Sequence, residues 1–218
     1  MAKGQGSQVR TLVLCGDRWH PPQTARTGLE MLKDDRFVFD WIENAEEWSA
    51  DRMSKAGVVM LTKSNDVSAT DPRPWATKQV QEAFRDYVRA GNGLLIIHSG
   101  SAGYAEMPVL RSLTGGTFLR HPSQCPVTVE PRPGHPLSAE STPFTAVDEH
   151  YMMALDDGQA DVFLSTTSEH GSQPGGWIRT EGQGRVCVLT PGHNLEVWLN
   201  PAYQTLLGNA LDWCAGLH

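Results

Sequence analysis

The sequence predicts a layered α/β fold, in which a mostly parallel β-sheet carries helices on both faces. In the first half of the chain, short segments rich in Val, Ile, Leu and Phe alternate with helical segments, as in buried parallel strands joined by crossover helices. In the second half, apolar segments follow one another without a convincing helix between them. We therefore expect antiparallel or mixed strands to extend the sheet there.

The first half supplies the parallel strands and one clear crossover helix. The helix is expected between the third and fourth strands, where Val80, Phe84 and Val88 recur every four residues, Thr77 can cap the start and Gly91 can end it. Parallel strands joined in this order require right-handed crossovers, which place helices against the sheet. The four predicted strands are "TLVLC" (11–15), "FVFDWI" (37–42), "GVVML" (57–61) and "GLLIIH" (93–98).

The second half predicts five further strands and a closing helix. The strands are "CPVTVEP" (125–131), "PFTAVDE" (143–149), "DVFLSTT" (161–167), "GWIRT" (176–180) and "RVCVLT" (185–190). The segment 200–218 has the apolar spacing of a packed helix, with Tyr203, Leu206, Leu207, Ala210, Leu211 and Cys214 on one face. No repeat or long linker divides the chain, so we expect one domain over residues 1–218, with residues 1–9 as a flexible N-terminus.

Composition and charge exclude several classes of partner. The 218 residues include 18 Lys and Arg against 25 Asp and Glu, and the net charge of -7 without a basic cluster argues against nucleic acid and anionic membranes. No segment approaches the roughly 20 apolar residues that span a bilayer, and the first ten residues are polar. The four cysteines are widely separated, without the CxxC spacing of a zinc site or the density of a disulfide scaffold, so we expect them to be reduced thiols. We expect a cytoplasmic location.

Polar, titratable residues follow the ends of four predicted strands. Ligands of open α/β sheets bind beyond the carboxyl ends of the strands, so these positions are the first candidates for a functional site. The candidates lie in "CGDRWHPPQTA", "GLLIIHSG", "VDEHY" and "TPGHNLEVW"; they are Asp17, His20, His98, Asp148, Glu149, Tyr151 and His193.

The three strand-end histidines each have a structural alternative. His98 could be a neutral, hydrogen-bonded cap of its strand, but the small residues directly after it favour a turn that exposes the side chain at the sheet edge. His193 follows Gly192 and an apolar strand, and has the same two interpretations. His20 could equally be a loop histidine that packs against Trp19.

The carboxylate and aromatic candidates are also open to two interpretations. Glu149 could be a solvated carboxylate, or it could pair with Asp148 so that each shifts the pKa of the other. His121, in "LRHPSQ", is a weaker candidate because loop histidines beside Pro are common. Trp177 and Trp198 are expected in the core, with stacking on a sugar ring as the alternative.

Motifs of familiar cofactor and hydrolase sites are missing from the sequence. There is no Walker loop, no GxGxxG after the first strand, no HExxH and no GxSxG, so we expect no nucleotide cofactor. Two mechanisms remain open for a histidine and carboxylate cluster. One is ligation of a divalent metal, zinc above all, with His20, His98 and His193 as candidate ligands, and the other is metal-free acid–base catalysis.

Six short motifs give the chain a family resemblance. They are "GDRWHP", "GLLIIHSG", "LTGGTFLRHP", "GHPL", "DEHY" and "GQGRVCVLTPGH", in this order. With them the chain resembles the ThuA-like (trehalose utilisation) family, a branch of the class I glutamine amidotransferase-like fold, from Thr11 to Trp213. The resemblance implies a single ThuA-like domain with a three-layer, flavodoxin-like sheet, mostly parallel with antiparallel additions, and a site at the strand ends.

The resemblance also indicates which chemistry has been lost. In amidotransferases of this fold the turn after the corresponding strand carries a nucleophilic cysteine, and a late histidine is followed two residues on by a glutamate. Here His98 stands in the cysteine's place, His193 matches the late histidine, and Leu195 replaces the glutamate. An imidazole cannot form the thioester of glutamine hydrolysis, and Cys15 follows a different strand, so glutaminase activity is not expected.

The residues and the resemblance together predict a sugar-processing enzyme, a hydrolase or isomerase acting on trehalose or a related disaccharide or keto-sugar. The alternative is a non-catalytic sugar-binding or regulatory module that kept the cleft after losing the nucleophile. A small-molecule sugar is the expected partner, and a homodimer is plausible from the remaining apolar and aromatic residues. We assign His98, Glu149 and His193 to catalysis, and Asp17, His121, Asp148 and Tyr151 to substrate binding.

Overall fold

The computed structural model describes residues 8–32, 34–156 and 158–217. Residues 1–7 of the predicted flexible N-terminus lie outside the described residues. Val9 already belongs to the first strand, so the prediction is wrong at that position.

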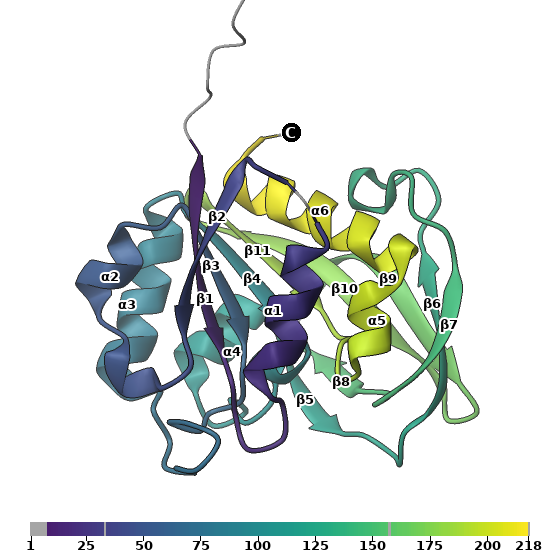
Figure 1. The fold of residues 1–218 in the computed structure, drawn as a ribbon, viewed down its shortest axis with the longest axis horizontal. Helices are drawn as coiled ribbons and strands as arrows, with labels where there is room; N and C mark the ends of the chain where they lie inside the picture. The colour runs from purple at the N-terminus through teal and green to yellow at the C-terminus, as the bar shows by residue number, and fades with distance from the viewer. Residues whose placement is uncertain (1–7, 33, 157, 218) are drawn as a thin grey trace, which may run out of the picture.

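A mixed sheet of nine strands runs through the molecule (Figure 1). The strand order is β2-β1-β3-β4-β11-β10-β9-β6-β7. The first five strands in this order are parallel to one another: β1 (Val9–Cys15), β2 (Phe37–Ile42), β3 (Val58–Thr62), β4 (Gly93–Ile97) and β11 (Gly184–Leu189). The other four continue it antiparallel: β6 (Cys125–Pro131), β7 (Phe144–Asp148), β9 (Asp161–Ser168) and β10 (Gly171–Glu181). The predicted parallel sheet with antiparallel additions is therefore confirmed.

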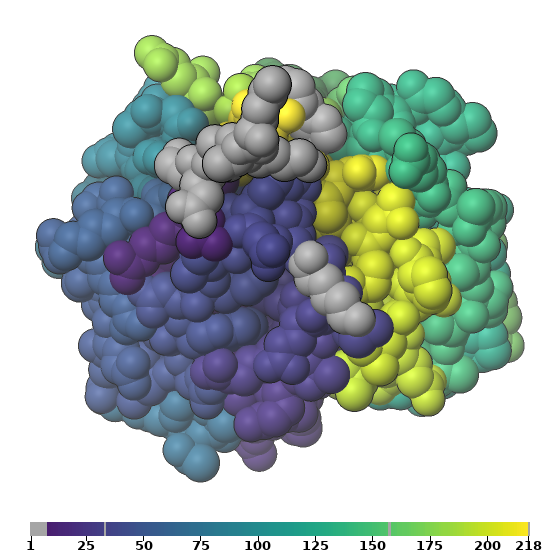
Figure 2. All heavy atoms as spheres, turned by 45° about the horizontal axis from the view of Figure 1, so that its top comes forward, coloured from purple at the N-terminus to yellow at the C-terminus, as the bar shows by residue number. Residues whose placement is uncertain are grey.

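Helices cover both faces of this sheet, which gives three layers (Figure 1). One face carries α2 (Ala50–Ser54), α3 (Lys78–Arg89) and α4 (Pro108–Thr114). The other carries α1 (Pro22–Glu30), α5 (Leu195–Leu199) and α6 (Pro201–Ala215). In Figures 1 and 2, α1 (purple) lies beside the yellow C-terminal helices, and the Gln204 amide of α6 donates a hydrogen bond to the Gly28 carbonyl of α1. No helix in the described ranges is both long and apolar enough to span a bilayer.

The two predicted helices form for the expected local reasons. The Thr77 hydroxyl accepts a hydrogen bond from the Val80 N–H and caps α3, which ends just before Gly91, whose φ is +108°. The Asn200 side chain caps α6 in the same way by accepting from the Ala202 N–H. All six residues of the apolar face predicted for α6 are buried. Burial of this face against the sheet is the main stabilising contribution of the helix.

Several elements escape the sequence pattern. A separate two-stranded sheet pairs β5 (Gly116–Arg120) with β8 (Met152–Leu155), neither of which the apolar pattern predicts. Three short 3₁₀ helices, Ala45–Glu47, His98–Ser101 and Pro136–Ser138, lie in connections. The second of them corrects the prediction that His98 closes a strand, because β4 ends at Ile97.

Candidate functional site

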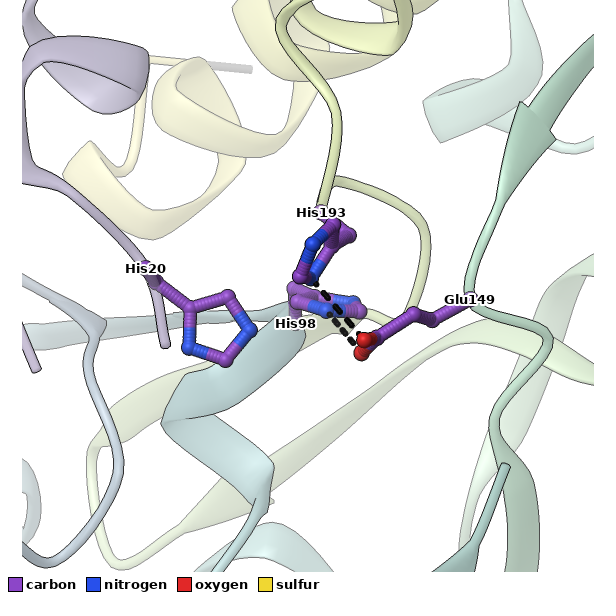
Figure 3. Close-up of side chains that lie close together, drawn as sticks. All are labelled: His20, His98, Glu149 and His193. Atoms are coloured by element: carbon purple, nitrogen blue, oxygen red, sulfur yellow. Dashed lines mark ion pairs between the residues drawn. The ribbon is translucent and has the colours of Figure 1, made fainter. Parts of the chain in front are cut away.

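Four side chains from distant parts of the chain converge at the carboxyl-end edge of the sheet (Figure 3). His20 follows β1, His98 follows β4, Glu149 follows β7 and His193 follows β11. One nitrogen or oxygen atom from each lies within 4.8 Å of those of the other three. The imidazole rings stand edge to face, with centroids 5.0 to 5.6 Å apart. We call these four residues the His/Glu cluster.

His98 occupies a strained elbow between β4 and the 3₁₀ helix that follows. Its φ is +46°, a left-handed conformation that a residue with a side chain rarely adopts. Gly100 makes the turn possible, because a Cβ atom there would lie 1.9 Å from the Leu61 carbonyl oxygen. His98 Nδ1 lies 2.8 Å from the Thr190 carbonyl oxygen, which can only accept, so Nδ1 carries the proton. Its other nitrogen, Nε2, faces the cluster.

His20 is held by the carboxylate of Asp17, three residues earlier. Its Nδ1 lies 2.7 and 2.9 Å from the two carboxylate oxygens. Burial opposes ionisation of Asp17, but hydrogen bonds from His20 and from the Ser64 and Trp19 N–H groups outweigh it and lower its pKa to about 2. Burial also lowers the pKa of His20, against the effect of Asp17. His20 is thus kept neutral, with Nε2 free of its own proton.

Glu149 lies between two imidazoles. Its Oε1 is 3.2 Å from His193 Nδ1 and its Oε2 is 3.3 Å from His98 Nε2, while His121 Nε2 is 3.6 Å from Oε2. Burial disfavours the charged carboxylate, but the interactions with His193 and His98 dominate and hold its pKa well below the usual range. The Glu149 carboxylate, 3.2 Å from His193 Nδ1, in turn raises the pKa of His193. The site therefore holds an ionised carboxylate beside a histidine that readily binds a proton.

Asp148 points away from Glu149 and shapes the loop that carries His193. Its buried carboxylate accepts hydrogen bonds from the N–H groups of Gly192, His193 and Asn194, at 2.8, 3.0 and 3.2 Å. Of the two interpretations of Glu149, pairing with Asp148 is wrong, because the two carboxylates have different partners. Asp148 instead connects the end of β7 to the loop after β11.

A cavity of about 870 Å³ opens beside the cluster, and His20, Glu149 and His193 form part of its wall. Two predicted substrate-binding residues also line it. His121 is partly exposed, while Tyr151 is buried, with its ring stacked on His98 at a centroid distance of 4.0 Å. Trp19, Ser64 and Asp66 also line the cavity.

The sequence analysis missed part of this cavity but placed two tryptophans correctly in the core. Trp19 is 66% exposed at the cavity, and the only signal for it is an aromatic residue in the loop after the first strand. The Ser64–Asp66 wall has no sequence signal, because it is brought to the cavity by the path of a long loop. The expected core position of Trp177 and Trp198 is confirmed: both are buried, and their indole N–H groups donate to backbone carbonyls, so the alternative of stacking on a sugar is wrong.

Comparisons with known proteins show the family of the chain and support the fold described above. Residues 10–214 match the model of the ThuA family, described as trehalose utilisation. A ThuA-like protein from Bacteroides uniformis superposes with a TM-score of 0.77 at 20% identity, covering 98% of this chain and 94% of that one. One from Parabacteroides merdae gives 0.73 at 17% identity, covering 96% and 90%.

A glutamine amidotransferase from Thermotoga maritima gives a TM-score of 0.61 at 14% identity, covering 96% of this chain and 99% of that one. These likenesses establish the class I glutamine amidotransferase-like fold. No curated protein matches the chain.

Proposed function

Since the chain belongs to the ThuA (trehalose utilisation) family, we propose that it is an enzyme that processes trehalose or a related disaccharide or keto-sugar at the His/Glu cluster. The observation that carries the proposal is the convergence of three imidazoles and one carboxylate at the wall of a large cavity. A cavity of this size with a few converging polar groups is typical of sites for small molecules.

The donor atoms of the cluster suit a divalent metal, zinc above all. Among the described residues, His20 Nε2, His98 Nε2 and His193 Nδ1 are buried and make no hydrogen bond of good geometry. Leaving such atoms without a partner costs about 1–3 kcal/mol each, so they favour a ligand. Asp17 and the Thr190 carbonyl hold His20 and His98 by their Nδ1 atoms, as the outer partners of metal-bound histidines do. The three histidines and Glu149 would hold the ion.

Each residue of the cluster then has a defined task. A bound divalent ion would supply Lewis-acid polarisation of a sugar oxygen. In the metal-free mechanism, which leaves both groups unligated, Glu149 accepts a proton from the substrate and His193, with its raised pKa, donates one. Tyr151 covers the face of His98 and keeps water from it.

The predicted substrate-binding residues divide into two groups in this proposal. His121 and Tyr151 line the cavity and can contact the sugar. Asp17 and Asp148 are buried, and their carboxylates accept hydrogen bonds from the protein itself. We assign them to positioning of His20 and His193 instead of to direct contact with substrate.

The proposal excludes a glutaminase. The elbow that carries the nucleophile in amidotransferases holds His98, which cannot form a thioester. Burial raises the pKa of the Cys15 thiol to about 12, which removes it as a substitute nucleophile at neutral pH. The other cysteines, Cys125, Cys187 and Cys214, are also buried.

Metal analysis combined with turnover tests the proposal. Elemental analysis of the purified protein should find one zinc per chain, and the metal should be lost in both His98→Ala and Glu149→Gln. Turnover of trehalose or its keto derivatives should fall at least about a hundredfold in both variants. His170→Ala, at an exposed histidine outside the cluster, is the matched control and should keep metal and turnover.

Two outcomes would contradict different parts of the proposal. Turnover that persists in a metal-free protein would support plain acid–base catalysis and overturn the metal assignment. Sugar binding without turnover of any of these sugars would overturn the enzyme and support the sugar-binding module.

A further inference from the structure

We propose that the cavity contains an outer sugar-binding subsite, formed by the indole of Trp19 and the carboxylate of Asp66, which selects substrates with a second sugar unit. The inference rests on the proposed function, because it takes the cavity to bind sugars. It assigns specificity to residues that lie outside the His/Glu cluster.

The cavity is larger than one sugar unit. A water-sized group takes roughly 30 Å³, so a cavity of about 870 Å³ has room for about 29 such groups, against about a dozen non-hydrogen atoms in a hexose. The four cluster atoms lie within 4.8 Å of one another and therefore occupy one part of the wall. A single hexose placed against them leaves the rest of the cavity to water, and a second sugar unit would contact lining residues outside the cluster. We call these lining residues, Trp19 and Asp66 among them, the outer wall.

Trp19 provides the apolar surface of the outer wall. Its side chain is 66% exposed, more than any other large hydrophobic side chain among the described residues. The Arg18 guanidinium lies 5.0 Å from the ring centroid and covers one face of the indole. Aromatic side chains that combine a large apolar surface with a polar edge suit ligands that have both kinds of surface, as a sugar ring does.

Asp66 provides the polar side of the same wall. It lines the cavity, and its Oδ2 accepts a hydrogen bond from the Ser64 hydroxyl at 2.9 Å. An ionised carboxylate only accepts hydrogen bonds, so it suits the hydroxyl donors of a sugar. An indole and a carboxylate that line the same cavity together suit a polyhydroxylated ring, which has both apolar faces and hydroxyl donors.

The outer wall is rigidly connected to the cluster. Asp17, which holds His20, also accepts hydrogen bonds from the Trp19 and Ser64 N–H groups, at 2.8 Å each. At the start of the loop that contains Ser64 and Asp66, the buried Lys63 ammonium donates to the Val67 carbonyl at 2.8 Å. The distance between the outer wall and the cluster is thus set by the fold before any ligand arrives, which lowers the entropic cost of binding.

Calorimetric binding tests the subsite without requiring turnover. The probes are trehalose, maltose, cellobiose and lactose, each compared with glucose, on the full chain with and without zinc. At least one disaccharide should bind at least about tenfold more tightly than glucose. Trp19→Ala should weaken that disaccharide about tenfold, or about 1.4 kcal/mol, and change glucose affinity less than about twofold. Asp66→Asn should weaken it about threefold.

Trp19→Ala removes only an exposed side chain and keeps the backbone N–H that Asp17 binds, so the variant should fold. Leu119→Ala, at a residue that is 60% exposed and not among the described residues lining the cavity, is the matched control and should bind like the wild type. Equal binding by the Trp19 and Leu119 variants, or no preference for any disaccharide over glucose, would overturn the subsite.

A repeat on the Glu149→Gln background separates this inference from the proposed function. If the Trp19 effect on binding persists while turnover is unaffected by Glu149→Gln, the subsite stands and the catalytic assignment is wrong. If turnover collapses in Glu149→Gln but Trp19→Ala changes nothing, the catalytic centre stands and the subsite is wrong.

Discussion

Replacement of Asp148 by asparagine removes one acceptor from the loop that carries His193. The asparagine side chain has the same shape, but one carboxylate oxygen becomes an NH₂ group that can only donate. The orientation that keeps the acceptors for His193 and Asn194 places this group against the Gly192 N–H, where the oxygen now accepts at 2.8 Å. Two donors then face each other in a buried position.

The cost follows from the three hydrogen bonds. One charge-assisted bond, worth about 1.5–3 kcal/mol, is lost, and the two that remain become weaker because their acceptor is neutral. We expect Asp148→Asn to lower the free energy of unfolding by about 3 kcal/mol. For a chain of this length, the corresponding fall in Tm is about 6–12 °C. Because the loop holds His193, zinc affinity should also fall, by about tenfold or more.

Urea unfolding followed by circular dichroism measures the first effect, and a competitive zinc chelator measures the second. Asp156→Asn is the control, since Asp156 is a surface carboxylate paired with Arg111 and should cost less than about 1 kcal/mol. A loss below about 1 kcal/mol in Asp148→Asn, or unchanged zinc affinity, would refute the argument that Asp148 holds the His193 loop.

Three further outcomes are expected. Gly100→Ala should cost at least about 3 kcal/mol by chemical denaturation, because its Cβ would overlap the Leu61 carbonyl; a loss under about 1 kcal/mol contradicts the elbow geometry. Cys15→Ser should retain sugar turnover within about threefold, since a thiol with a pKa of about 12 takes no part as a thiolate; abolished turnover contradicts this. Burial lowers the pKa of Lys63 from 10.5 to about 8, so the folded state loses this proton at a lower pH than the unfolded chain does. The free energy of unfolding should therefore rise between pH 8 and 10.5, by up to about 3 kcal/mol relative to Lys63→Met. Parallel pH profiles of the two proteins would contradict this prediction.

Local pattern was sufficient for most of the sheet and two of the helices. The strands β2 and β6 coincide with their predicted bounds, because the alternation and density of apolar residues that define a buried strand are local properties. Short elements were missed. The strands β5 and β8 owe their pairing to each other, across more than thirty residues of chain, and their sequences carry no strong apolar alternation.

The candidate site was predictable to the extent that polar groups follow apolar strands. His20, His98, Glu149 and His193 were selected in this way, and the structure brings them together. Their individual roles stay predictions. The partners were not predictable: the carboxylate beside His193 is that of Glu149, which follows β7, and β7 lies four strands away from β11 in the sheet order.

By itself, the sequence determined the alternation of apolar strands with helices, the polar residues at their ends and the presence of histidine where a nucleophile would stand. Only the tertiary structure decided that Asp148 and Glu149, adjacent in the chain, turn to different partners, and that Trp19 stands exposed at the cavity wall. The reason is physical. Strand formation depends on neighbours within a few residues, whereas the environment of a side chain depends on which distant segments the packed sheet brings within hydrogen-bonding distance.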